Sequence, residues 1–456
     1  MKKELIITII LAIPALNGCG IYTHYQRPEG LPTDSLYRDI PAGEDTTSLA
    51  SLSWRELFSD PQLVKWIELG LEQNTDLQTA QLKVEEAEAT LLSAKLAFLP
   101  SVSLSPEGSL SSFDGSKATK TYNLGASASW ELDIFGSQRN AKESARALLE
   151  QSKAYQQAVQ TQLIATIADT YYSLLKLDKQ LIITRQTVEN WQKNVRMTSA
   201  LKRAGQADEA AVTQAEANRL EAEASILTLE RQIHELENSF STLLGMVPGD
   251  IERGEISNQD FPADMSVGIP LQLVSKRPDI RQAEYNLASA FYATNQARSA
   301  FYPSIVLGGS AGWTNSAGSM IINPGKFLAT AIGSLTQPLF NRGANIAQLK
   351  IAKAQQEEAK LSFQQALLNA GSEVNDALVK YQTARDKAGL FEKQIASLEK
   401  AYESTSLTML YGNTTYLEVL TAQQSLLSAQ LTQVANRFME IQGVINLYQA
   451  LGGGRE

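Results

Sequence analysis

The sequence has little of the chemistry that enzymes and metal sites use. It contains one cysteine, Cys19, and two histidines, His24 and His234, among 456 residues. A lone thiol excludes an internal disulfide and a multi-cysteine metal site, and two histidines so far apart are too few for a usual His-rich metal site. Neither a Gly-x-Ser-x-Gly elbow nor a phosphate-binding loop occurs. We therefore expect no catalysis, no metal and no cofactor.

The sequence also lacks an excess of positive charge and a second long apolar run. Its formal net charge is -9, which argues against nucleic acid as a partner because phosphate binding needs clustered Lys and Arg. No stretch beyond the N-terminus approaches about 18 consecutive apolar residues, so no transmembrane helix is expected. If the mature chain crosses a membrane, it must do so as a closed β-barrel.

The chain begins with an export signal. Residues 1–18 combine two lysines with an apolar run that is too short for a spanning helix. They end in Leu16-Asn17-Gly18-Cys19, which is typical of a bacterial lipobox that is cleaved before Cys19 and lipidated on its thiol. An ordinary signal peptide with an incidental cysteine is the alternative, but the signal context and the unique cysteine coincide. Gly20, rather than Asp, follows, and in this lipoprotein class that implies sorting to the outer membrane.

An internal repeat takes up nearly half the chain per copy. Residues 76–102 realign on residues 279–305 at a constant offset of 203, and Gly205 corresponds to Gly412 at an offset of 207. Matching Pro and Gly positions in the same order argue against a chance likeness between Ala-rich helices. The predicted organisation is a signal peptide (1–18), a lipidated N-terminal segment (19–61), a first repeat (62–245), a linker in the equatorial region (246–270), a second repeat (271–452) and a C-terminal tail (453–456).

Each repeat is predicted to contain two strands. From Tyr122 to Ile134 apolar and polar residues alternate without a break, after a polar loop from Ser111 to Thr121 and a partner strand that starts at Val102. Residues 305–313 and 327–340 occupy the same places in the second repeat. The apolar face would be core in a soluble sandwich and would face lipid in an outer-membrane barrel. Four strands cannot close a water-filled barrel, whereas three chains would supply twelve, so we expect a homotrimer.

The predicted helices are longer than a globular protein needs. Residues 138–204 and 342–410 contain no proline, and at about 1.5 Å per residue each helix would reach about 100 Å. Apolar residues recur every seven positions from 167 to 195 and from 374 to 402. Such a spacing indicates coiled-coil packing against neighbouring helices.

Gly205 and Gly412 follow these long helices, at positions where a helix can end in a left-handed turn. Helical sequence resumes after each glycine. Each repeat is therefore predicted to end in a helical hairpin.

Seven short segments recur in a recognisable order between Cys19 and the C-terminus. They are Tyr25-Gln26-Arg27-Pro28, Trp54-Arg55-Glu56-Leu57-Phe58, Glu131-Leu132-Asp133-Ile134-Phe135-Gly136, Lys276-Arg277-Pro278-Asp279-Ile280, Tyr302-Pro303-Ser304, Tyr416-Leu417-Glu418-Val419-Leu420 and Leu447-Tyr448-Gln449-Ala450-Leu451-Gly452-Gly453-Gly454. On these segments the chain resembles the outer membrane factor family of TolC/OprM-type ducts. Within it, the chain resembles the lipidated branch that serves pumps of the resistance–nodulation–division class.

The resemblance implies an α+β membrane protein, a homotrimer whose twelve-stranded β-barrel continues into a long periplasmic α-helical barrel. It implies a lipid-anchored place in the outer membrane of a Gram-negative bacterium, in contact with outer-membrane lipid. A periplasmic adaptor would dock at the hairpin turns of Gly205 and Gly412, and an inner-membrane resistance–nodulation–division transporter would supply the energy. The duct itself would have no catalysis and would pass drugs or metal ions outward.

The resemblance also implies a closed aperture on the helix after the second Gly turn, with Leu417, Glu418 and Thr421 as candidate gate residues. Three Glu418 carboxylates around a threefold axis would form a ring that favours cations, although a solvated carboxylate on an exposed helix face is the alternative. Family members often have Asp at Thr421, so one acidic ring is missing. The position equivalent to Glu418 in the first repeat is Ala211, and the partners of the TolC salt-bridge lock correspond to Met409 and Thr414. We therefore expect packing around Leu417 to hold the tip shut.

Two other functions stay open. The same duct fold could serve protein secretion by a type I exporter, although the lipobox and Gln26-Arg27-Pro28 favour drug or metal efflux. A non-conducting coiled-coil protein tethered to the membrane is the second alternative, but such a protein would have no need for four strands.

Overall fold

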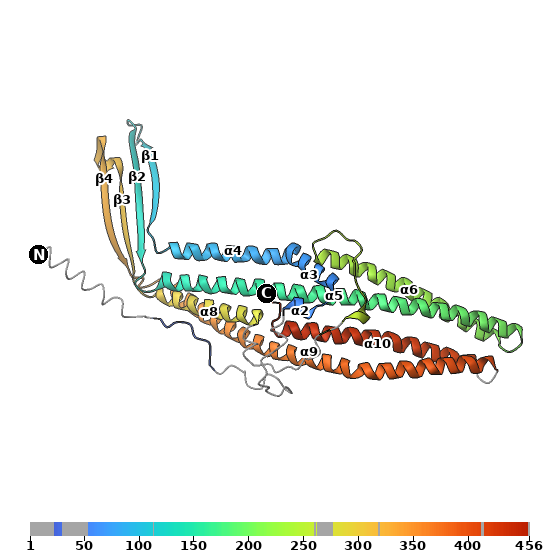
Figure 1. Ribbon diagram of the computed structural model, residues 1–456. Coiled ribbons are helices and arrows are strands. Elements are labelled where there is room, and N and C mark those ends of the chain that lie inside the picture. The colour runs from blue at the N-terminus through green and yellow to red at the C-terminus, as the bar shows by residue number, and fades with distance from the viewer. Residues whose placement is uncertain are drawn as a thin grey trace. The chain divides into compact units, whose positions relative to one another are not determined.

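The computed structural model describes residues 22–29, 53–112, 114–259, 261, 277–317, 320–411 and 415–454. Its elements confirm the predicted order, because helix, two strands, long helix and second helix occur twice (Figure 1). The elements are α2 (Trp54–Leu57), α3 (Pro61–Gln73), α4 (Thr75–Leu96), β1 (Ser101–Ser111), β2 (Thr119–Leu132), α5 (Ser137–Arg203), α6 (Glu209–Leu243), the 3-10 helix η3 (Ile256–Asn258), α8 (Pro278–Ser299), β3 (Ser304–Ala317), β4 (Met320–Thr336), α9 (Ala344–Leu410) and α10 (Tyr416–Ala450).

The chain forms two compact units, which we describe separately. The sheet unit comprises residues 1–31, 82–154 and 281–365, and the helical unit comprises residues 32–81, 155–280 and 366–456.

The sheet unit contains one antiparallel sheet in the order β1-β2-β3-β4, so the β2–β3 pair joins the two halves of the sequence. At this seam Gly125 lies opposite Gly312, where a Cβ atom on Gly312 would lie 2.3 Å from the Cα of Gly125. Only glycine fits so close an approach. Every residue of β1 is exposed, and among the described residues β1 and β4 each pair on one side only.

Several predicted strand boundaries are wrong. The loop between Ser111 and Thr121 is shorter than predicted, because Ser111 pairs with Thr119 and both strands continue to that pair. In the second half, β4 begins at Met320 rather than at residue 327, because Met320 pairs with Ala317 of β3. It ends at Thr336 rather than at residue 340, because Pro338 has no N–H to donate to a ladder.

Side chains at the strand ends tie the sheet to the helices of its unit. The carboxylate of Asp133 accepts hydrogen bonds from the N–H groups of Gln138 (2.9 Å) and Arg139 (2.9 Å), and so caps the first turn of α5. The rings of Phe135 and Tyr302 stack with their centroids 5.2 Å apart. This stack joins the turn after β2 to the turn before β3.

The described N-terminal segment, residues 22–29, packs on α8. The ring of Tyr25 meets Phe291 edge-on, with the centroids 5.9 Å apart, and the guanidinium of Arg27 pairs with the carboxylate of Glu284. Burial raises the pKa of Tyr25 to about 12, so the phenol stays neutral.

The helical unit is built around aromatic and aliphatic side chains from segments that are far apart in the sequence. Each fully buried side chain of this size contributes about 1.5–3 kcal/mol relative to exposure. The largest fully buried members include Trp54, Phe58, Tyr171, Tyr172 and Phe240.

The long helices match in length between the two halves. α5 and α9 each contain 67 residues, and α6 and α10 each contain 35. The positions of the seven-residue pattern, from Ile167 to Val195 and from Val374 to Tyr402, are all buried or half-buried. The predicted packing of these positions against neighbouring helices is therefore confirmed.

The end of α6 depends on Gly245. Its φ is +72°, and a Cβ atom there would lie 2.9 Å from the backbone oxygen of Gln73. Gly205, after α5, has a similar φ of +76°, but nothing lies within 4 Å of its Cβ position.

We expect Gly245→Ala to destabilise the protein more than Gly205→Ala does. A side chain in the left-handed backbone region costs about 1–2 kcal/mol at either position, but only at Gly245 does the new methyl group also meet a backbone atom. Thermal unfolding of the full-length protein in mild detergent, followed by circular dichroism, should show the larger fall in melting temperature for Gly245→Ala. Equal falls would contradict the role assigned to the contact with Gln73.

Candidate functional site

The tip of the α5–α6 hairpin is a tight glycine turn. The N–H groups of residues 205 and 206 return to carbonyl oxygens of the last turn of α5, at 3.0 and 2.9 Å, a pattern that ends helices at a left-handed residue. Asp208 then starts α6, because its carboxylate accepts a hydrogen bond (2.8 Å) from the N–H of Ala211. The predicted left-handed turn at Gly205 is confirmed, whereas Gly412 lies outside the described residues.

The candidate gate residues lie in the first two turns of α10. Leu417, Glu418 and Thr421 are exposed, whereas Val419 and Leu420 are buried. The side chain of Leu417 is 67% exposed, and the hydroxyl of Thr421 donates to its carbonyl oxygen (2.8 Å). Residues three and four positions apart lie on the same side of a helix, and Thr421 lies three residues after Glu418 and four after Leu417, so the structure brings all three predicted residues to one exposed face.

A hollow of about 1010 Å³ separates the α5–α6 turn from the start of α10. Gly205, Asp208, Leu417 and Tyr416 are among its lining residues. Burial raises the pKa of Tyr416 to about 12, and within the described part of the chain its hydroxyl has no hydrogen-bond partner. The hollow is therefore lined by both apolar and polar side chains, and the neutral phenol of Tyr416 is buried beside it.

A buried amide pair joins the two hairpins further along the helices. Asn194 of α5 donates from Nδ2 to Oε1 of Gln423 in α10, and neither residue is more than 4% exposed. Sequence reasoning missed this pair, although Asn194 lies seven positions after Thr187, which is also buried. In coiled coils a single buried polar residue fixes the register of the paired helices.

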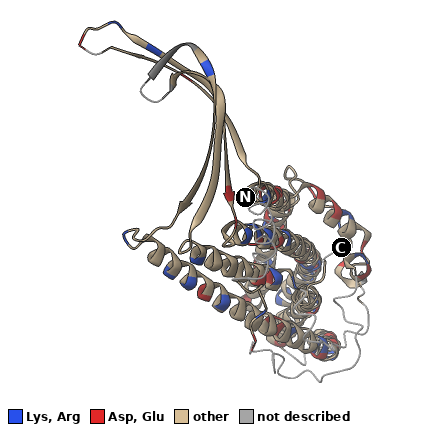
Figure 2. Ribbon diagram, turned by 90° about the vertical axis from the view of Figure 1, so that its left-hand side faces the viewer, with Lys and Arg blue, Asp and Glu red and all other residues tan. Residues whose placement is uncertain are grey.

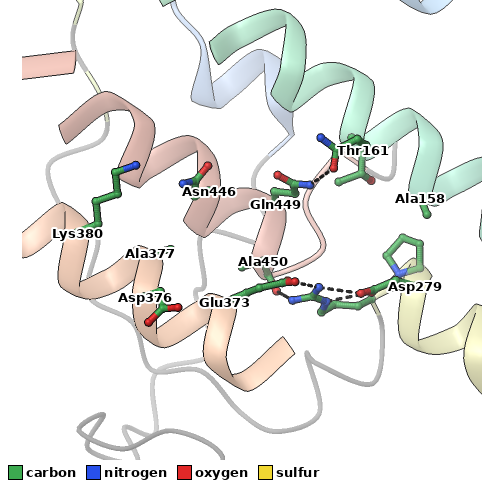
Figure 3. Close-up of a pocket in the computed structure, with 13 residues that line it drawn as sticks. Ala158, Thr161, Asp279, Glu373, Asp376, Ala377, Lys380, Asn446, Gln449 and Ala450 are labelled. Atoms are coloured by element: carbon green, nitrogen blue, oxygen red, sulfur yellow. Dashed lines mark hydrogen bonds and ion pairs between the residues drawn. The ribbon is translucent and has the colours of Figure 1, made fainter. Parts of the chain in front are cut away.

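A second hollow, of about 570 Å³, lies at the start of α8 and contains Arg277 (Figure 3). Arg277 is 6% exposed and donates to the carboxylates of Asp279 (2.8 and 3.0 Å) and Glu373 (2.6 Å) and to the carbonyl oxygen of Ala450 (2.8 Å). Burial opposes the charge of Arg277, but the hydrogen bonds and ion pairs to the two carboxylates raise its pKa. One side chain thus joins the start of α8, the middle of α9 and the end of α10, which sequence reasoning did not predict.

A related cluster anchors the chain after α6. Arg253 forms ion pairs with Asp178 of α5 (2.5 Å) and Glu237 of α6 (2.5 Å). Nearby, the hydroxyl of Tyr171 donates to the carboxylate of Asp60 (2.6 Å), and burial raises the pKa of Tyr171. These partners come from distant parts of the sequence, so no local pattern could have identified them.

One face of the sheet is lined by hydroxyl groups, which pair across the strands as the predicted alternation requires. These pairs are Ser103 with Ser127 (2.8 Å), Ser109 with Thr121 (2.6 Å) and Ser310 with Thr330 (2.7 Å). A hollow of about 930 Å³ on the sheet is lined partly by Glu107, Asn123 and Thr314, which share one register row. Such a face is suited to contact with water.

The remaining predictions concern histidines, metals and membrane helices. His24 and His234 are exposed. Within the described ranges no group of three or more His, Cys, Asp or Glu is placed to hold a metal ion. None of the helices described here is long and apolar enough to cross a membrane. The predicted lipidation site, Cys19, lies outside the described residues.

Residues 66–246 and 269–453 match the family profile of outer membrane efflux proteins, which covers most of the chain. The chain belongs to this family. It is 30% identical over 446 residues to the cation efflux system protein CusC of Escherichia coli O6:H1, with 96% of each chain covered. It is 31% identical over 470 residues to the probable outer membrane lipoprotein SilC of Salmonella typhimurium, with 98% of each chain covered.

A solved structure shares the fold. The open state of the MtrE outer membrane channel of Neisseria gonorrhoeae is 27% identical, with a TM-score of 0.85 over 96% of this chain and 99% of that one. The predictions of a TolC/OprM-type outer-membrane efflux duct, located in the outer membrane and without catalytic activity, are confirmed by this family membership.

We expect Arg277→Met to destabilise the helical unit by about 2–3 kcal/mol, because the carbonyl of Ala450 then loses its donor and the two carboxylates lose their counter-charge. Urea unfolding of the full-length protein in mild detergent measures this loss. Asp279→Asn is the control and should cost about 1 kcal/mol or less, because Glu373 still pairs with the guanidinium. A loss for Arg277→Met no larger than that of the control would contradict the role assigned to Arg277.

Proposed function

We propose that three copies of the chain assemble into a homotrimer whose twelve strands close a β-barrel in the outer membrane, continuous with a periplasmic α-helical barrel. One observation carries this proposal, namely that the sheet of a single chain has one-sided pairing at β1 and β4 and an entirely exposed β1. Unpaired backbone groups along an edge strand are costly in lipid. Pairing β1 of one copy with β4 of the next satisfies both edges, and twelve strands leave room for water.

The same proposal includes two copies of one unit, residues 62–245 and 271–452, joined through the linker 246–270. Equal element lengths support it, since the first helix, long helix and second helix contain 22, 67 and 35 residues in each half. A trimer would then present six similar hairpins.

We infer that residues 1–18 are removed and that Cys19 carries the acyl chains. The lipobox supports this, and SilC, a relative of similar length, is named an outer membrane lipoprotein.

We infer that the hairpin tips form the aperture and the adaptor site. Leu417, Glu418 and Thr421 share an exposed face of α10, which a threefold axis would turn into three stacked rings. The turn at Gly205 and the predicted turn at Gly412, with the hollow beside Tyr416, would offer a periplasmic adaptor both apolar and polar side chains. A resistance–nodulation–division transporter in the inner membrane would drive export through this route. The cargo is small molecules, drugs or metal ions, and the name of CusC favours cations.

The native mass of the full-length protein, purified from membranes in mild detergent, tests the assembly. We expect a homotrimer whose subunits carry acyl chains, and Cys19→Ser should remove the acyl mass. A monomer that is stable without lipid and soluble without detergent would overturn the proposal in favour of a tethered coiled-coil protein.

We expect Glu418→Ala to lower the cation-over-anion permeability ratio of the duct in planar bilayers, roughly twofold or more, because a ring of carboxylates attracts cations. Glu403→Ala is the matched control, since Glu403 is an exposed carboxylate of α9 near the same tip. It removes the same charge and should leave the reversal potential in a salt gradient unchanged. Equal effects of the two substitutions would show that Glu418 is an ordinary solvated side chain.

A further inference from the structure

The sheet unit concentrates positive charge where its strands meet its helices. Four segments directly adjoin the strands, residues 89–100, 133–147, 293–303 and 337–353, and together they contain eight Lys or Arg and two Asp or Glu, in a chain whose net charge is -9. Figure 2 shows Lys and Arg on the helices that adjoin the strands. The eight residues, here called the basic collar, are Lys95, Arg139, Lys142, Arg146, Arg298, Arg342, Lys350 and Lys353.

Most of this charge is not neutralised within the chain. The carboxylate of Asp133 is occupied as the cap of α5, and Glu143 pairs with Lys142 (3.5 Å) and Arg146 (3.9 Å). The other six members of the collar are exposed, and within the described residues none of them makes an ion pair. Six exposed cations that form no ion pair leave an excess of positive charge where the strands meet the helices, so the collar is suited to a partner that supplies negative charge.

The segments that carry the collar are tied together at the strand ends. Nε1 of Trp130 donates to the carbonyl of Phe98 (2.9 Å), which joins β2 to the end of α4. Nδ2 of Asn345 donates to the carbonyl of Ala300 (2.9 Å), which joins α9 to the end of α8. The stacked rings at the turns after β2 and before β3 connect these two halves. The segments that carry the collar are therefore held together at the strand ends.

Exposed aromatic side chains lie at the ends of the strands, next to the segments that carry the collar. Phe301 and Tyr302 are 41% exposed, Trp130 is 40% exposed and Phe340 is 86% exposed. Aromatic residues in this position are typical of the boundary between the hydrocarbon core and the headgroups of a membrane. The collar, on the helical side of this boundary, then lies at the level of the headgroups.

The position of the N-terminal segment independently supports placing the collar at the level of the headgroups. A Cβ atom on Gly136 would lie 3.4 Å from the ring of Tyr22, so Tyr22 lies against the turn after β2. Cys19 precedes Tyr22 by three residues, which span at most about 11 Å when fully extended. Acyl chains on Cys19 would enter the bilayer beside the strand ends.

We propose that the basic collar binds the headgroups of anionic phospholipids in the periplasmic leaflet of the outer membrane. The collar supplies several cations to a phosphodiester that carries a net negative charge, whereas a zwitterionic headgroup offers its own ammonium and is bound less tightly. This inference rests on the proposed insertion of the sheet into the outer membrane.

Native mass spectrometry of the full-length protein in mild detergent tests the proposal, with phosphatidylglycerol and phosphatidylcholine of the same acyl chains as probes. We expect phosphatidylglycerol to bind about tenfold or more tightly than phosphatidylcholine at low salt, with a smaller difference at high salt. The triple variant Arg298→Gln, Arg342→Gln, Lys350→Gln should reduce this preference to about twofold or less. The control is Lys193→Gln, Lys393→Gln, Lys400→Gln, which removes three exposed charges from the helical unit and should keep the preference.

The proposal would be overturned if the triple collar variant kept the wild-type preference for phosphatidylglycerol. It would also be overturned if the wild-type protein showed no such preference. Competition by soluble glycerol phosphate as strong as that by phosphatidylglycerol would assign the collar to free phosphate esters instead and would also overturn it. Conductance in planar bilayers separates this outcome from failure of the proposed function. A protein that conducts but does not prefer anionic lipid would contradict only the proposed lipid binding by the collar. A protein that neither trimerises nor conducts would contradict the proposed duct.

Discussion

A β-strand in lipid cannot leave its backbone N–H and C=O groups unpaired, and under the proposed insertion of the sheet into the outer membrane this requirement governs the assembly of the protein. The sheet of one chain has two edges and a β1 that is exposed throughout, so a single chain cannot complete it. Each strand end is also the start or end of a helix in the same chain. Whatever arrangement closes the sheets must therefore also set the arrangement of the helices that continue from them.

In the helical unit, buried polar side chains hold the helices in a fixed arrangement. Arg277 joins α8, α9 and α10, and Arg253 joins α5 and α6 to the segment between the two halves. Because buried charges are costly unless paired, these arginines hold their elements in one arrangement more strictly than apolar packing would. The buried amide pair of Asn194 and Gln423 acts in the same way between the hairpins.

Local patterns in the sequence were sufficient for the element order, the long helices and the turn at Gly205, because each of these follows from periodicity or from a residue that only one backbone conformation suits. Strand boundaries were less predictable, since the start of β4 depends on the pairing of Met320 with Ala317 and its end on Pro338. Of the candidate site, the shared face of Leu417, Glu418 and Thr421 follows from helical spacing. The partners of Arg277 could not be predicted from helical spacing, because Glu373 and Ala450 lie 96 and 173 residues away in the sequence.

The equal lengths of α5 and α9, and of α6 and α10, constrain how such a chain can change. One residue inserted into α5 alone would advance its tip by about 1.5 Å and rotate every later side chain by about 100° relative to α9. The buried seven-residue pattern of α5 would then no longer correspond to that of α9, and the two hairpins would differ in length. Length is consequently a shared property of four helices, and viable insertions or deletions must arrive in matched sets or in multiples that restore the helical phase.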